Sequence, residues 1–219
     1  MRKWLIRIPL YLIAASILVV LVLRWVPVRF TPLMLKRACQ FCGDSTYHRE
    51  QKWVSLEEFS PELLDAVVLS EDHKFYAHHG FDWKALGWLW RHRNDAVPRM
   101  GGSTISQQTA KNVFTFGTRT FVRKAAEAWW TLLIELIWGK DRILEVYLNV
   151  VETGRGLYGA AAAAEHYFSL PVSDISPSQA VSLAVCLPSP LTSTPLAPLD
   201  TVRWKRVKAE LEIVRSYPQ

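Results

Sequence analysis

The chain has 219 residues, of which half are hydrophobic and ten are tryptophan, so it can bury one sizeable core and is not intrinsically disordered. A second large domain does not fit within this length. The formal net charge is +6, but seven of the 26 basic residues and no acidic residue lie in residues 1–37, which leaves 19 basic against 20 acidic residues in the remainder. The basic character belongs to the N-terminal segment, so nucleic-acid binding has little support.

An uncharged apolar run extends from Ile8 to Leu23, and it continues to Val26 if the Arg24 side chain reaches the membrane surface. At about 1.5 Å per residue, residues 8–26 match a hydrocarbon layer of about 30 Å, so we expect a single membrane span. A cleavable signal peptide is the alternative. Because no small-x-small cleavage site follows Leu23, we favour an uncleaved signal anchor. Basic residues flank both ends of the run, so charge leaves its orientation open.

Cys39 and Cys42 form a lone C-x-x-C pair just beyond this segment. The pair suits half a zinc site, a redox pair or a local disulfide, and an incidental structural pair is the plainer alternative. Neither Cys186 nor the six histidines have the spacing of a zinc peptidase site.

The remainder of the chain has the pattern of a mainly helical domain. Ser60 and Pro61 give an N-cap and a first-turn proline ahead of an apolar stripe, so we expect a helix that runs toward Glu71. A capping box over residues 176–179 begins another helix. Further helices are predicted over residues 83–93, 106–113, 123–138 and 142–149, and from near Asp200. Because no alternating run exceeds four or five residues, strands contribute little.

Residues 70–82 form the first cluster whose side chains could take part in catalysis or binding. Glu71, Phe75 and His78 fall at i, i+4 and i+7, so on a helix a carboxylate, a ring and an imidazole share one face. A solvated helix end is the alternative.

Residues 101–112 form the second cluster. Paired glycines before a helix start rich in Ser and Thr leave backbone N–H groups free for an anion, and Thr104, Gln108 and Lys111 recur on one side. The segment is not a Walker A loop, because Lys111 lies nine residues after the second glycine. A plain N-capped amphipathic helix is the alternative.

The third cluster is basic. Residues 99–142 hold seven basic and three acidic side chains, which suits a bound phosphate group. The alternative is ordinary i,i+4 pairing on exposed helices, such as Arg123 with Glu127, worth only about 0.3 to 0.5 kcal/mol.

In this order the clusters closely resemble the successive motifs of the peptidoglycan glycosyltransferases, glycosyltransferase family 51. The resemblance covers about Ser60 to Pro190. Its motifs read Glu71-Asp-x-x-Phe75-x-x-His78-x-Gly80, Gly102-Ser-Thr-Ile-Ser-Gln107-Gln108-x-x-Lys111-Asn112, Arg123-Lys124-x-x-Glu127 and Ile143-Leu-Glu-x-Tyr147-Leu-Asn149. Thr131 stands where the family prefers alanine, which concerns helix packing rather than chemistry.

The resemblance implies a lysozyme-like helical lobe, a small membrane-associated jaw and a cleft between them. Together with the signal anchor predicted over 8–26, it implies a cytoplasmic tail over residues 1–7, a juxtamembrane connection over 27–49 and a glycosyltransferase domain over 50–219. It also implies a single-pass protein of the bacterial inner membrane with its catalytic domain on the periplasmic side. The sequence has neither S-x-x-K nor K-T-G, so we expect no transpeptidase activity.

The implied reaction polymerises lipid II. The 4-OH of the acceptor GlcNAc attacks the donor MurNAc anomeric carbon, which inverts from α to β, and the lipid pyrophosphate leaves. Glu71 matches the general base, and Glu127 matches a glutamate that supports the pyrophosphate or its counter-cation. The residues expected to organise the base or contact the substrate are Asp72, Phe75, His78, Thr104, Gln108, Lys111, Asn112, Arg123 and Lys124.

The implied helper ion is Mg²⁺ or Mn²⁺, with Glu127 a possible ligand, and no organic cofactor is expected. Expected partners are lipid II, the growing lipid-linked glycan chain and membrane lipids; proteins of cell division or cell-wall synthesis are open, and nucleic acid is not expected. A peptidoglycan muramidase is one alternative, but it has no use for Lys111, Arg123 and Lys124 near a phosphate. A non-catalytic membrane scaffold leaves the three clusters unexplained.

Residues 113–121 contain three phenylalanines and no acid, between Lys111 and Arg123. The resemblance places this stretch in the jaw, where Phe114, Phe116 and Phe121 would rest at the headgroup boundary and guide the lipid substrate toward the cleft. A buried core segment is the alternative.

Overall fold

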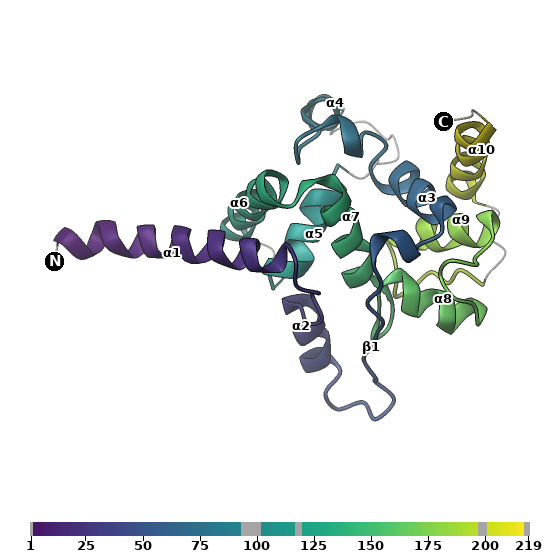
Figure 1. Ribbon diagram of the computed structural model, residues 1–219, viewed down its shortest axis with the longest axis horizontal. Coiled ribbons are helices and arrows are strands. Elements are labelled where there is room, and N and C mark those ends of the chain that lie inside the picture. The colour runs from purple at the N-terminus through teal and green to yellow at the C-terminus, as the bar shows by residue number, and fades with distance from the viewer. Residues whose placement is uncertain (1, 93–101, 117–119, 197–200, 217–219) are drawn as a thin grey trace.

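The computed structural model describes residues 2–92, 102–116, 120–196 and 201–216, with side chains from Arg7 onward. The part of the chain that it describes is mainly helical, as predicted, with one small sheet (Figure 1). The predicted helix end at Arg93 and helix start near Asp200 lie outside the described residues.

Two groups of packed helices form the body. The first group contains α3 (Pro61–Glu71), α9 (Pro177–Cys186) and α10 (Val202–Ser216). The second contains α5 (Ile105–Phe114), α6 (Phe121–Ile137) and α7 (Gly139–Val150). The C-terminal end of α3 faces α5, so the two groups meet where the first and second sequence clusters come together.

The predicted local signals at two of these helices are confirmed. The Ser60 side chain accepts a hydrogen bond from the Leu63 N–H at the start of α3, and Pro61 occupies the first helical position. At α9, Ser176 and Gln179 form the complete capping box. Helices α5, α6 and α7 overlap the predicted ranges to within three residues at each end.

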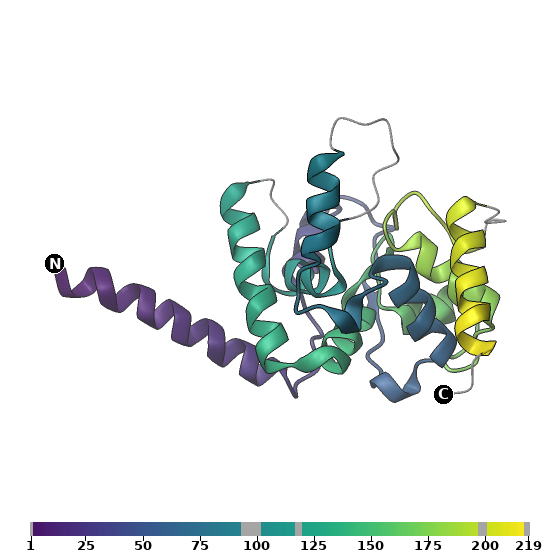
Figure 2. The ribbon, with the colours of Figure 1, turned by 90° about the horizontal axis from the view of Figure 1, so that it is seen from above.

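Helix α1 (Arg2–Leu23) projects from the body at the N-terminus (Figures 1 and 2). It ends three residues before the predicted span does. Among the helices of the described residues, none has the combined length and apolar character needed to cross a membrane. The span predicted over residues 8–26 is therefore not confirmed.

Several elements were not predicted because their patterns are short or uniform. Helix α2 (Pro32–Gln40) begins at an N-cap, Thr31, and helix α8 (Ala160–Phe168) starts with five consecutive buried alanines that form no one-sided stripe. Strand β3 (Leu157–Tyr158) lies between β1 (Glu50–Gln51), which is parallel to it, and β2 (Glu152–Gly154), which is antiparallel. Two or three residues are too few to show alternation.

Asn149 joins the connection before α3 to the body. Its buried side-chain amide exchanges two hydrogen bonds with the backbone of Val54, both of 2.9 Å, and it also donates to the Glu145 carbonyl. Gly159 has a φ of +84°, and a Cβ there would lie 2.8 Å from the Asn149 carbonyl oxygen. Only glycine lets the chain pass α7 this closely before α8 begins.

Candidate active site

Glu71 is the last residue of α3, and its side chain is only 6% exposed. Its Oε2 accepts a hydrogen bond of 2.9 Å from Gln108 Nε2 on α5, and its Oε1 accepts one of 2.7 Å from Arg203 Nη2 on α10. One amide and one guanidinium from two other helices therefore hold the carboxylate in a fixed orientation.

Tyr147 fixes the orientation of the Gln108 amide. The fully buried Tyr147 hydroxyl donates to Gln108 Oε1 at 3.4 Å, which leaves the Gln108 NH₂ group directed at Glu71. Burial raises the pKa of Tyr147 well above its usual value, and the negative charges of Glu71 and Asp72 act in the same direction while Arg203 opposes them. Tyr147 thus stays a neutral hydrogen-bond donor.

Asp72 and His78 lock the start of α5 rather than line an open site. The buried Asp72 carboxylate accepts from His78 Nε2 at 2.9 and 3.0 Å, and its Oδ2 accepts from the Ile105 N–H at 2.9 Å. Because His78 Nδ1 accepts from the Gly80 N–H, the imidazole proton sits on Nε2. The prediction that this helix start leaves N–H groups free for an anion is wrong at Ile105, where Asp72 already supplies the negative charge.

Thr104 is similarly engaged. Its hydroxyl donates to the Gly80 carbonyl at 2.7 Å and accepts from the Gln107 N–H at 3.1 Å, and Gln107 completes the capping box. Asn112 is buried on the same helix, and Phe75 is fully buried with the Lys140 ammonium 4.5 Å from its ring centroid. All three side chains are buried, and the substrate contacts predicted for them stay predictions.

A partly buried charge pair lies against Phe75 and was not predicted as part of the site. Lys140 Nζ donates to Glu135 Oε1 at 2.7 Å, and the Ser106 hydroxyl donates to the same oxygen. Because the three residues belong to α7, α6 and α5, these contacts link the three helices beside the Phe75 ring.

The predicted basic cluster forms on α5 and α6. Glu127 is buried, pairs with Arg123, and has its Oε2 3.5 Å from Lys124 Nζ. The i,i+4 pairing considered as the alternative is therefore present. Desolvation lowers the pKa of Lys111, which Arg123 and Lys124 lower further, while Glu127 and Glu71 oppose the shift. Three cations against one paired carboxylate leave a positive surplus that a phosphate group can neutralise.

The site offers little for a metal ion by itself. Within the described ranges, no group of three or more His, Cys, Asp or Glu side chains is arranged to hold one. Both oxygens of Glu127 already face cations, so the residues present do not fit a preformed Mg²⁺ or Mn²⁺ site.

Arg203 is the contact that sequence reasoning missed. Its Nη2 donates to the Ser70 carbonyl at 2.8 Å, the Ser70 hydroxyl at 2.9 Å and Glu71. Arg203 lies beyond the matched motifs in a stretch rich in Lys and Arg, which concealed it. One signal was present: Arg203, Val207 and Leu211 recur every four residues, so Arg203 continues the buried face of α10.

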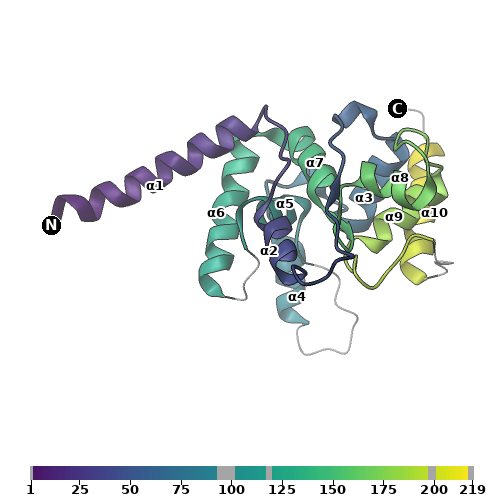
Figure 3. The same cartoon turned by 90° about the horizontal axis from the view of Figure 1, so that it is seen from below.

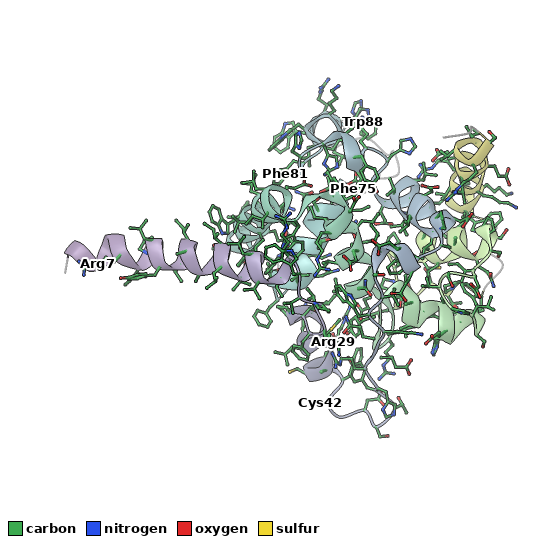
Figure 4. All side chains as sticks on the ribbon, viewed as in Figure 1. Arg7, Arg29, Cys42, Phe75, Phe81 and Trp88 are labelled. Atoms are coloured by element: carbon green, nitrogen blue, oxygen red, sulfur yellow. The ribbon has the colours of Figure 1, made fainter. Side chains whose placement is uncertain are left out.

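The stretch over residues 113–121 divides between core and surface. Phe114 is half-buried and stacks on Trp130 with ring centroids 4.2 Å apart, which favours the core alternative for it, while its place at the headgroup boundary stays a prediction. Phe116 is exposed, and Phe121 is 97% exposed. Helix α4 (Trp83–Arg91) stands out from the body nearby and exposes Trp83 and Trp90; Trp88 also lies on it (Figure 4).

Comparison with known proteins agrees with this geometry. A family model described as Transglycosylase matches residues 39–214. The biosynthetic peptidoglycan transglycosylase of Caulobacter vibrioides is 42% identical over 208 residues, 95% of this chain and 84% of the relative. The protein of the same name from Shewanella oneidensis is 46% identical over 187 residues, 85% of this chain and 80% of the relative. The chain therefore belongs to the transglycosylase family, which confirms the resemblance found in its motifs.

Proposed function

We propose that the protein is a peptidoglycan glycosyltransferase that elongates glycan strands from lipid II. The observation that carries the proposal is the buried Glu71 carboxylate at the end of α3, held by Gln108 and Arg203, with Lys111 of the basic cluster within electrostatic range of it. A base and a phosphate-binding cluster side by side suit transfer from a sugar diphosphate.

Glu71 acts as the general base in the proposed reaction. It takes the proton of the acceptor GlcNAc 4-OH while that oxygen bonds to the donor MurNAc anomeric carbon, and the bond from that carbon to the pyrophosphate oxygen breaks. The linkage formed is β-1,4, and the carbon inverts from α because attack comes from the face opposite the leaving group.

Lys111, Arg123 and Lys124 stabilise the leaving lipid pyrophosphate. Pyrophosphate leaves without needing a proton, so the chief requirement is positive charge where negative charge grows. A muramidase has no such requirement, and a scaffold needs no buried carboxylate fixed by two donors. Glu127 positions the cations by accepting from Arg123 and facing Lys124.

A divalent cation, Mg²⁺ or Mn²⁺, is proposed to arrive with the substrate rather than to occupy a preformed protein site. The support is that Glu127 is already paired, whereas pyrophosphate oxygens are strong ligands for such ions. The protein alone is then expected to show no Mg²⁺ binding by calorimetry, and the protein with lipid II to show it.

We further propose that residues 8–26 anchor the protein in the cytoplasmic membrane with the catalytic domain on its outer face, where lipid II would reach the site. The support is the run of exposed apolar side chains on α1, among them Leu10, Leu12 and Leu18. Membrane lipids would contact this helix, and proteins of cell division or cell-wall synthesis remain candidate partners. We propose no transpeptidase activity, which labelled penicillin tests directly.

The decisive experiment incubates the purified full-length protein with labelled lipid II and resolves the products by gel electrophoresis. A ladder of glycan chains that disappears with Glu71→Gln supports the proposal. Release of short sugars from finished peptidoglycan, with no ladder from lipid II, would establish the muramidase instead.

A further inference from the structure

Helix α1 meets the body through its C-terminal half. Ser16 and Val20 are buried, whereas Leu10 and Leu12 near its other end are exposed. Helix α1 reaches the body at the corner where α6 ends and α7 begins (Figure 2), and its N-terminal part, where Arg7 lies, stands away from the body (Figure 4).

Polar side chains of this corner bind the backbone of the last turn of α1 and of the residues just after it. Trp138 Nε1 donates to the Val20 carbonyl at 2.7 Å, and Arg142 Nη2 donates to the Leu23 and Val26 carbonyls at 2.8 and 2.7 Å. The Val20 carbonyl also accepts from the Arg24 N–H, and this end of α1 carries the negative end of the helix dipole. Because α1 has no basic residue in its last turn, Arg142 supplies the missing cation from outside.

Further contacts hold the two donors in place. Arg142 Nη1 pairs with Glu145 at 2.9 Å, so the guanidinium is fixed between α7 and α1. One turn back along α1, the Ser16 hydroxyl accepts from Trp129 Nε1 at 3.2 Å. The contacts therefore span two turns of α1, which resists rotation as well as separation.

The elements that bind α1 also carry the candidate active site. Trp129 lies two residues after Glu127 on α6. The Trp138 ring lies 6.1 Å from the ring of Phe114, which ends α5, the helix of Gln108 and Lys111. The corner and the basic cluster thus belong to one packed unit. If the angle between α1 and this unit changes, the position of the basic cluster relative to α1 changes with it.

The C-terminal ends of α1 and α6 meet at the corner, and the two helices diverge from there. The start of α6, with the exposed Phe121, therefore lies on the same side of the corner as the N-terminal end of α1 (Figures 2 and 3). We propose that the α6–α7 corner, defined by Trp129, Trp138 and Arg142, is a clamp that fixes the angle of α1 and thereby the height of the basic cluster above the bilayer. Trp138 and Arg142 are then positioning residues for a membrane-held pyrophosphate substrate. This step rests on the proposed function.

The test compares the wild-type chain with Trp138→Phe/Arg142→Gln, which keeps most of the side-chain volume and removes the indole and guanidinium donors to the end of α1. Arg215→Gln is the matched control, because Arg215 pairs with Asp65 on the surface of the other helix group. Hydrogen exchange in lipid nanodiscs reports the amides of Arg24 and Val26, which bond to the last turn of α1. Polymerisation of lipid II is measured both in liposomes and in detergent micelles.

We expect exchange at these amides to rise about tenfold or more in the double variant and not in the control. Turnover should fall about tenfold in liposomes, where substrate height is fixed, and change little in micelles. Unchanged exchange, or faster exchange with full turnover in liposomes, would overturn the clamp. If the wild type polymerises in neither medium, the proposed function fails, and the exchange result alone then decides whether the corner holds α1. Trp138→Phe by itself serves as the second variant if the double variant does not fold.

Discussion

Exchanging the side chains of Glu71 and Gln108 separates the role of the carboxylate from the stability of its surroundings. In Glu71→Gln, each of the two side-chain oxygen positions faces a donor, from Gln108 and from Arg203. The new NH₂ group must therefore oppose one of these donors. A buried donor without an acceptor costs about 1–3 kcal/mol, so the single variant should lose stability as well as activity.

The double variant Glu71→Gln/Gln108→Glu restores the pairing. The amide introduced at position 71 would accept from Arg203 and donate to the carboxylate introduced at position 108, which would still accept from the Tyr147 hydroxyl. Stability should return to within about 1 kcal/mol of wild type, because every donor again has an acceptor. The carboxylate, however, has moved to α5. Polymerisation should stay reduced by about 10² to 10⁴, the usual contribution of a general base.

The assays are thermal unfolding and the lipid II gel assay, with both variants run in parallel. At this chain length, 1 kcal/mol corresponds to about 2–4 °C in Tm, so the loss and recovery of stability are measurable. Recovery of stability without activity identifies Glu71 as the base. Activity of the double variant within about threefold of wild type would refute that assignment, since such a loss is far below the usual effect of removing a base.

Three further predictions concern Lys111, Arg203 and the phenylalanines of residues 113–121. Because the pKa of Lys111 is lowered from 10.5, we expect turnover to fall on the alkaline side before an ordinary lysine would lose its proton, and Lys111→Arg should remove that fall in a pH–rate profile. Arg203→Lys should lower kcat by about tenfold, since one ammonium replaces a planar fork, while the far-ultraviolet spectrum stays unchanged; wild-type kcat would argue against its positioning role. In a form lacking residues 1–27, Phe116→Ser/Phe121→Ser should weaken binding to anionic liposomes without changing Tm. In the same form, Phe114→Ser should lower stability by about 3 kcal/mol, because the Phe114 ring stacks on Trp130 against the core. Equal liposome binding by the exposed-residue variant would place the membrane contact elsewhere.

Helix starts and the order of motifs could be predicted from the sequence because they depend on neighbouring residues. A cap such as Ser60 before Pro61 satisfies N–H groups within one turn, whatever the rest of the fold does. Glu71 and Gln108 were likewise identified from motif spacing, and the structure brings them into direct contact.

Tertiary structure alone decided which of these polar groups pair with other groups of the protein. Asp72 belongs to the first motif, yet its carboxylate accepts hydrogen bonds from His78 and from the Ile105 N–H in the first turn of α5. The contact with Ile105 spans 33 residues, which motif spacing cannot show. Arg203 reaches Glu71 across 132 residues because α10 packs on α3. Phe114 and Phe121 have the same composition around them, and only the packing of α5 against α6 half-buries one ring and leaves the other exposed. Burial and long-range pairing arise from how helices meet, which a local pattern does not contain.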